Sequence, residues 1–319
     1  MVIHEWVYVL IGAGRMSVAS LSFPSFRCPK CLAPSNDLIH DHKNNITCKA
    51  CGFIMAHDGD VWDARLGKGY PLDFSRQWQL WEEGRFGDTR RVYGKTDEED
   101  FKDLLGLIGL SCDHLRGMAI LEIGFGHGRI LREIQRHCPS AFGLDLVRPL
   151  PSSKLLASSV ICGDLLSIPL MPAQFDLVIC RGVVHHTSDP SRAFRCAADQ
   201  VRPHGILYAY IYEESIPKSL ALRRMLPWSW RFPESVRIGL SAAVATVRAS
   251  LEAIKKKGFS RADFSQSMGN YMLGTYDVLS PRWTTRHHPD EVLSWFAECG
   301  FDAVRKAACQ YVGVRSMKP

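Results

Sequence analysis

The sequence has no apolar run long enough to cross a bilayer, no internal repeat and no low-complexity tract. Its first apolar stretch, residues 6–13, is far shorter than the roughly 20 residues that a membrane helix needs. Glu5 precedes this stretch and Arg15 follows it, whereas a secretory signal carries its positive charge before the apolar run. We therefore expect neither stable membrane insertion nor export, and we treat residues 1–26 as an N-terminal extension.

Most of the 11 cysteines show no pattern of a disulfide framework. Seven of them are scattered and odd in number: Cys112, Cys138, Cys162, Cys180, Cys196, Cys299 and Cys309. Such thiols fit a reducing compartment, so the sequence predicts a cytoplasmic protein. With 319 residues, 46% hydrophobic and 23% charged, the chain can bury a full core and carry attachments besides.

The other four cysteines form two CxxC pairs, Cys28 with Cys31 and Cys48 with Cys51. The spacing between the pairs lies within the C-x2-C-x15–20-C-x2-C pattern of zinc ribbons. Four thiolates around a tetrahedral zinc ion leave no open position, so the predicted zinc is structural. Disulfides, or thiols with no common partner, are the alternative interpretation.

A dinucleotide fingerprint is also missing, because the glycines at 124, 126 and 128 read GxGxG and not GxGxxG. Glu122 stands two residues before the first glycine. This arrangement resembles motif I of the class I S-adenosylmethionine-dependent methyltransferases. Glycines there let the backbone turn tightly and approach a ligand closely. A glycine-rich turn of another α/β protein is the alternative.

Apolar segments after and around this motif recur at the spacing of a doubly wound sheet. The predicted elements are strands at 118–123, 141–146, 160–161, 175–180 and 206–212, helices at 129–137 and from 190 to about 201, and two last strands within 301–315. The resemblance implies that Asp145 binds the ribose hydroxyls and that Asp164 binds the adenine amino group. The cofactor-binding candidates are Glu122, Gly124, Gly126, Gly128, Asp145, Asp164, Leu165 and Arg181.

Residues 181–190 closely resemble the "GVLHHTPDP" segment of the same family. Ligands of open α/β sheets bind at the carboxyl ends of the strands, so this loop should border the methyl-acceptor site. His185 and His186 are the catalytic candidates, since imidazole can serve as a general base near neutral pH. Bracing of the loop is the alternative role for His186.

The stretch from 215 to 260 is strongly basic, with nine Lys or Arg against two Glu. We expect it to cover the acceptor site. Its charge could attract an anionic substrate, contact RNA or an acidic membrane surface, or lie on a solvated helix face. The segments after it resemble "D-x-x-SP" and "H-x-x-x-EV-x-x-WF" sequences of bacterial methyltransferases, which suggests the acceptor-side residues Tyr271, Tyr276, His287 and His288.

The sequence thus predicts an α/β protein with a doubly wound, seven-stranded, Rossmann-like methyltransferase sheet and a small N-terminal zinc ribbon. The predicted parts are an extension (1–26), the ribbon (27–62), connecting helices (63–117), the methyltransferase domain (118–213 and 281–319) and the basic insertion (214–280).

Three functions are compatible with these motifs. The first is methyl transfer to a small-molecule acceptor, for which an anionic group would suit the insertion. The second is RNA methylation with the ribbon and the insertion holding RNA, although no Asn/Asp-Pro-Pro-aromatic motif follows the strand at 175–180. The third, a non-catalytic binding protein, is disfavoured because Glu122, Asp145 and Asp164 are all intact.

Overall fold

The computed structural model describes residues 24–317 except 43, 68–72, 89, 157–158, 215–221, 223–224 and 257. The extension expected at 1–26 therefore lies almost wholly outside the described residues. The described chain divides into two compact units. Unit 1 contains residues 24–67, 101–213 and 285–317, and unit 2 contains 73–100 and the described part of 214–284.

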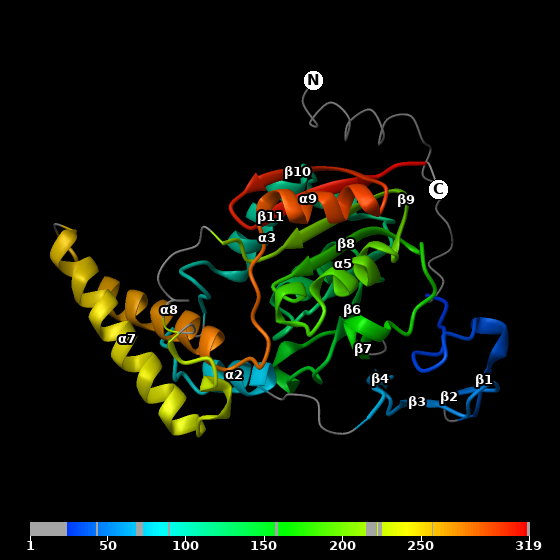
Figure 1. The fold of residues 1–319 in the computed structure, drawn as a ribbon, viewed down its shortest axis with the longest axis horizontal. Helices are drawn as coiled ribbons and strands as arrows, with labels where there is room; N and C mark the ends of the chain where they lie inside the picture. The colour runs from blue at the N-terminus through cyan, green and yellow to red at the C-terminus, as the bar shows by residue number, and fades with distance from the viewer. Residues whose placement is uncertain are drawn as a thin grey trace. The chain divides into compact units, whose positions relative to one another are not determined.

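Unit 1 is built on one sheet with the strand order β1-β2-β3-β4-β7-β6-β5-β8-β9-β11-β10 (Figure 1). The strands are β1 (Leu38–His40), β2 (Ile46–Cys48), β3 (Ile54–His57), β4 (Val61–Asp63), β5 (Ile120–Ile123), β6 (Phe142–Asp145), β7 (Val160–Cys162), β8 (Phe175–Arg181), β9 (Val201–Tyr210), β10 (Phe301–Ala307) and β11 (Gln310–Arg315).

The strands from β7 to β10 in this order form the predicted seven-stranded, doubly wound sheet. β7, β6, β5, β8 and β9 are parallel neighbours, while β11 runs antiparallel to both β9 and β10. The predicted fold class is confirmed. After β5 the chain adds β6 and β7 on one side of that strand, and it then returns to add β8 on the other side. The carboxyl ends of β5, β6 and β8 therefore lie at a topological switch point, where open α/β sheets bind ligands.

Successive side chains of a strand point to opposite faces of the sheet, so they belong to two different hydrophobic cores. Leu121 and Ile123 pack with residues of α5 (Pro190–Ala198) and α9 (Pro289–Glu298) on one face of the sheet. Ile120 packs with residues of α3 (Asp97–Ile108) and α4 (Arg129–His137) on the other. Figure 1 shows α5 and α9 in front of the sheet and α3 behind it.

The four short strands of residues 38–63, which lie among and after the paired cysteines, continue the same sheet at its β7 edge. β1, β2, β3 and β4 pair antiparallel in chain order, and β4 then pairs parallel with β7. Val61 lies beside Val160 and Asp63 beside Cys162. The backbone groups at this edge of β7 are thereby paired rather than exposed.

Two neighbouring predicted boundaries are wrong. The helix expected to reach about residue 201 ends at Ala198, and the strand expected from 206 begins at Val201. Val201 pairs with Phe175 before the register shifts, and His204 has a φ of +63°. The Pro203–Gly205 stretch lies between the predicted helix and the predicted strand, and in the structure it is part of an irregular start of β9.

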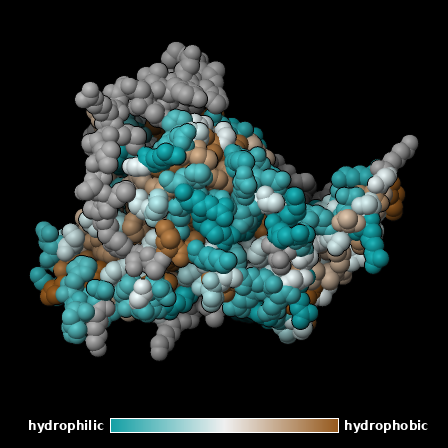
Figure 2. Space-filling view, turned by 180° about the vertical axis from the view of Figure 1, so that it is seen from behind, coloured by the Kyte–Doolittle hydropathy of each residue, from teal (hydrophilic) through white to brown (hydrophobic). Residues whose placement is uncertain are grey.

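Unit 2 consists mainly of α2 (Asp73–Glu82), α7 (Glu234–Lys255) and α8 (Arg261–Leu279). Its core includes Trp81, Phe86 and Tyr276. Ser260 caps α8 in a capping box with Asp263, which satisfies amide groups at the start of the helix. Within the described residues, no helix combines the length and hydropathy required to cross a membrane. The face in Figure 2 is largely hydrophilic, with separate hydrophobic patches.

Candidate active site

The glycine motif forms the turn between β5 and α4. Gly124, Gly126 and Gly128 all have positive φ, at 77°, 55° and 82°. A Cβ on Gly124 would lie 2.0 Å from Cγ2 of Val183, in the loop after β8. Glycine is thus required at Gly124 both by backbone conformation and by space.

Asp145, the last residue of β6, holds this turn in place. Its Oδ2 accepts the amide hydrogen of Gly126 at 2.8 Å, and its Oδ1 accepts that of Val147 at 3.1 Å. Burial raises the pKa of Asp145, and the bond from Gly126 opposes this rise. Asp145 thus ends β6 as the sequence predicted, and its role in binding the ribose hydroxyls, which two acceptor oxygens would suit, stays a prediction.

The other cofactor candidates lie at the carboxyl ends of neighbouring strands. Asp164 follows β7 and caps a short 3-10 helix, accepting the amide hydrogen of Leu166 at 2.9 Å. Leu165 is buried beside it. Glu122 is buried within β5, and Arg181 ends β8. The sheet topology therefore gathers all of the predicted cofactor residues at one edge.

His185 is fully buried in the 3-10 helix that follows β8. Its Nδ1 accepts the amide hydrogen of Tyr212 at 3.2 Å, and its ring stacks on that of Tyr212 with centroids 3.8 Å apart. Burial holds the pKa of His185 well below its usual range. A neutral ring whose Nδ1 accepts must carry its proton on Nε2. That Nε2 is buried and has no hydrogen-bond partner among the described residues.

The chain returns to this loop from the segment before α9. Thr285 donates its amide hydrogen to the carbonyl oxygen of His185 at 2.8 Å, and His287 donates its own to that of Tyr212 at 3.0 Å. The imidazole of His287 contacts the hydroxyl of Thr285 at 2.9 Å and the carboxylate of Glu291 at 3.1 Å. His185 and His287, far apart in sequence, are thus held beside the same strand end.

The remaining catalytic and acceptor-side candidates have other surroundings. His186 is half-buried, with its ring centroid 4.3 Å from that of His185. His288 caps α9 by accepting the amide hydrogen of Asp290. Tyr271 and Tyr276 belong to unit 2, where Tyr276 is fully buried against Phe86. The catalytic role of His186 and the substrate roles of the other three residues stay predictions.

The four paired cysteines converge at the start of unit 1. All four sulfur atoms lie within 4.8 Å of one another, with 3.5 Å between Cys28 and Cys51 and 3.6 Å between Cys31 and Cys48. A tetrahedral site with zinc–sulfur bonds of about 2.3 Å has edges of about 3.8 Å, so the donor set fits zinc. Each pair folds as a knuckle, in which the amides of Leu32 and Gly52 donate to the carbonyls of Cys28 and Cys48 at 2.9 Å.

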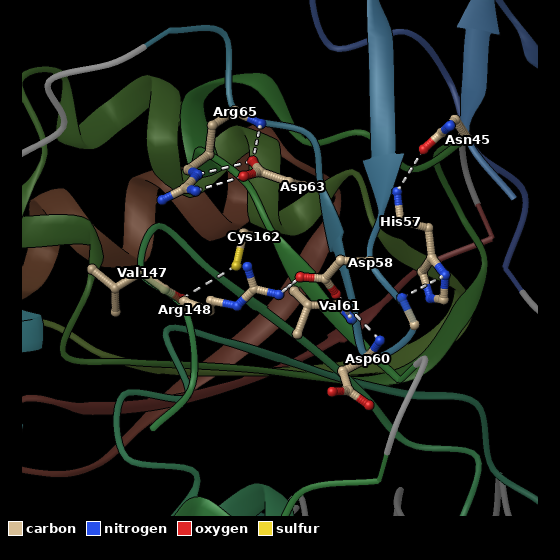
Figure 3. Close-up of polar contacts among 11 residues, drawn as sticks. Asn45, His57, Asp58, Asp60, Val61, Asp63, Arg65, Val147, Arg148 and Cys162 are labelled. Atoms are coloured by element: carbon tan, nitrogen blue, oxygen red, sulfur yellow. Dashed lines mark hydrogen bonds and ion pairs between the residues drawn. The ribbon is translucent and has the colours of Figure 1, made fainter. Parts of the chain in front are cut away.

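Two features of the site were missed by the sequence analysis. The backbone of Tyr212 fixes the tautomer of His185, which no side-chain pattern reveals. The ribbon also contacts the loop at the carboxyl end of β6. There Asp58 forms an ion pair with Arg148, three residues after Asp145 (Figure 3). Opposite charges at 58 and 148 were visible in the sequence, but nothing there indicated that these residues would meet.

Residues 121–209 match the family model described as "Methyltransferase domain". These residues therefore form a methyltransferase domain, in agreement with the resemblance in the motifs.

Three particular proteins illustrate the similarity. The ubiquinone biosynthesis O-methyltransferase of Escherichia coli O127:H6 is 29% identical over 142 residues, which are 42% of this chain and 55% of that protein. The uncharacterized protein syc1184_c of Synechococcus sp. is 38% identical over 51 residues, 16% of this chain and 12% of that protein. The chain thus spans about half of the length of the first of these curated relatives and 12% of the length of the second. The solved magnesium protoporphyrin IX methyltransferase of Synechocystis PCC 6803 is 12% identical, with a TM-score of 0.45 and coverage of 77% of this chain and 97% of that one.

Proposed function

We propose that this protein transfers a methyl group from S-adenosylmethionine to a small-molecule acceptor bound beside His185. The observation that carries the proposal is the convergence of the glycine turn, Asp145 and Asp164 at the ends of three adjacent parallel strands. Bound there, S-adenosylmethionine supplies an electrophilic methyl group, which the acceptor's lone pair takes while sulfur keeps the electrons of the broken carbon–sulfur bond.

The chain's own residues then have separate tasks. The glycine turn and the two aspartates hold the nucleoside, so that the reacting atoms are aligned in line. His185 supplies an Nε2 proton donor to orient an oxygen or nitrogen of the acceptor, because its Nδ1 already accepts from the backbone. In this tautomer His185 is not the general base. His186 remains the candidate to accept a proton from a hydroxyl acceptor.

Two observations favour a small molecule over RNA. The E. coli relative is named for O-methylation in ubiquinone biosynthesis, which supports a small acceptor with an oxygen nucleophile. Several basic groups of the insertion are also engaged inside unit 2. Arg231, Arg237 and Arg248 lie over the rings of Trp230, Tyr276 and Tyr271, and Lys256 pairs with Glu252. Those charges are less available to phosphates.

We further propose that Cys28, Cys31, Cys48 and Cys51 bind a structural zinc ion. Support comes from the four convergent sulfur atoms and the two backbone knuckles. Four thiolates complete the tetrahedral shell, so this metal would stabilise the ribbon and take no part in methyl transfer.

Binding of S-adenosylhomocysteine, the demethylated product, tests the cofactor site. We expect Asp145→Ala to weaken binding by about a hundredfold or more, since a carboxylate hydrogen bond to each hydroxyl is worth about 1.5–3 kcal/mol. Asp302→Ala, at an exposed position of β10, is the matched control. Equal calorimetric affinities for the two variants would refute the assignment of Asp145.

The acceptor is tested with radiolabelled S-adenosylmethionine in a size-fractionated cell extract, treated or untreated with nuclease. Label in a nuclease-resistant small-molecule or lipid fraction supports the proposal, whereas nuclease-sensitive label supports RNA as the acceptor. With an acceptor in hand, His185→Phe should lose turnover but keep S-adenosylhomocysteine binding, and His185→Gln should keep part of the turnover by supplying an N–H donor. Loss of binding in both variants would instead indicate a structural role.

A further inference from the structure

The ribbon contributes a strand to the sheet that carries the cofactor site. β4 runs parallel to β7, with Trp62 beside Ile161 and Asp63 beside Cys162. The amide of Ala64 extends this ladder by donating to the carbonyl oxygen of Cys162 at 2.8 Å. Cys162 stands two residues before Asp164. The carboxyl end of β7, from which Asp164 projects, is therefore paired on its outer side by the ribbon.

A second connection joins the ribbon to the loop after β6. Asp58 occupies the turn between β3 and β4, where its Oδ1 accepts the amide hydrogens of Asp60 at 3.2 Å and Val61 at 3.1 Å. Its other carboxylate oxygen pairs with the guanidinium of Arg148 (Figure 3). The turn is thus ordered by the same carboxylate that binds Arg148.

The loop that bears Arg148 is the one that Asp145 organises. The amide of Val147 donates to Asp145 at 3.1 Å, and the thiol of Cys162 lies 3.6 Å from the carbonyl oxygen of Val147. The next residue is Arg148, held by Asp58. The backbone beside the ribose-binding acid is consequently held by β6, by β7 and by the ribbon.

From these contacts we infer that the ribbon is part of the cofactor site, and that metal binding at its cysteines and cofactor binding at the sheet edge reinforce each other. The inference rests on the proposed function. Asp58 and Arg148 are positioning residues, which act on the cofactor through the 145–148 loop. Coupling between two sites is reciprocal, so bound cofactor must retain the metal as strongly as bound metal favours the cofactor.

The first experiment measures both directions of this coupling in the full chain. Zinc affinity is measured by equilibrium competition with a chromogenic chelator, with and without S-adenosylhomocysteine, and S-adenosylhomocysteine affinity is measured by calorimetry before and after zinc removal. We expect S-adenosylhomocysteine to raise the zinc affinity, and zinc removal to lower the S-adenosylhomocysteine affinity, each on the order of tenfold or more, a typical strength of coupling between sites.

The outcomes separate the two proposals. If the zinc-loaded wild type does not bind S-adenosylhomocysteine, the proposed function fails. If it binds, but zinc-stripped protein binds equally well and the ligand leaves the zinc affinity unchanged, only the coupling is overturned.

Variants of the ion pair test its part in the coupling. Both side chains are about half exposed, so Arg148→Met and Asp58→Asn should each weaken S-adenosylhomocysteine binding by only roughly two- to fivefold. Arg148→Lys, which keeps the charge, should restore most of the affinity for S-adenosylhomocysteine. The loss of affinity among these variants should not follow their melting temperatures. Asp60→Asn is the matched control, because Figure 3 shows its carboxylate directed away from Arg148. If Arg148→Met binds S-adenosylhomocysteine as tightly as the wild type does, the ion pair takes no part in the coupling.

Discussion

Glu213 offers the sharpest test of how the segment after β9, whose Tyr212 contacts His185, is stabilised. The carboxylate is fully buried and accepts two hydrogen bonds from Arg305, both at 2.7 Å. It also accepts the hydroxyl hydrogen of Tyr311 at 2.6 Å and the amide hydrogen of Cys309 at 2.9 Å. These donors, chiefly Arg305, lower the pKa of Glu213 from 4.5 to about 2.

The magnitude follows from the pKa shift. A shift of this size corresponds to about 3 kcal/mol of folding free energy, which we reduce to about 2 kcal/mol because the Arg305 side chain is 40% exposed. Since the folded-state pKa is the lower one, this stability is fully present above pH 4.5 and is lost as the pH falls towards 2.

The assay is urea unfolding followed by circular dichroism at several pH values from 7 to 3. Glu213→Gln should be less stable than the wild type at pH 7, and the difference should shrink in acid. Arg305→Met should cost about 3 kcal/mol at pH 7, because it leaves a buried carboxylate without its cation, and it too should recover relative to the wild type in acid. Variants are compared with the wild type at each pH, since acid would also protonate the four cysteines that we propose bind zinc.

Asp302→Asn, which alters an exposed carboxylate of the same hairpin, controls for a general charge effect. Our account of the cluster would be refuted by a Glu213→Gln variant as stable as the wild type at pH 7. A deficit of the same size at pH 7 and pH 3 would equally exclude a contribution from ionisation.

Two further predictions concern the metal and the glycine turn. Elemental analysis of protein purified without chelators should find about one zinc per chain, lost along with stability in Cys28→Ser but not in Cys112→Ser; a metal-free wild type would exclude the zinc proposal. Gly124→Ala should weaken S-adenosylhomocysteine binding by on the order of tenfold or more, because the turn must shift away from Val183. The control is Gly117→Ala, which carries a similar positive φ with nothing within 4 Å of its Cβ. Equal binding by the two glycine variants would show that the overlap has no consequence.

Features that depend on short stretches of sequence were predictable. The strands and helices from β5 to β8 follow apolar periodicity, and the predicted bounds of α4 agree with the structure. The start of β9 was not predictable in this way, since the Pro203–Gly205 stretch carries the composition of a break. Its pairing with β8 overrides that local signal.

The sequence by itself determined the class of domain, the candidate cofactor residues and the paired cysteines, because each depends on residue types at fixed spacing within one strand, turn or knuckle. Only the tertiary structure decided that β4 pairs with β7 and that Asp58 meets Arg148, because pairing at a sheet edge depends on which backbone groups remain available after folding. The tautomer of His185 was decided at the same level, by the backbone amide of Tyr212, which lies just after the end of β9. Local spacing specifies what a residue can do, and the packing of distant segments specifies which partner it finds.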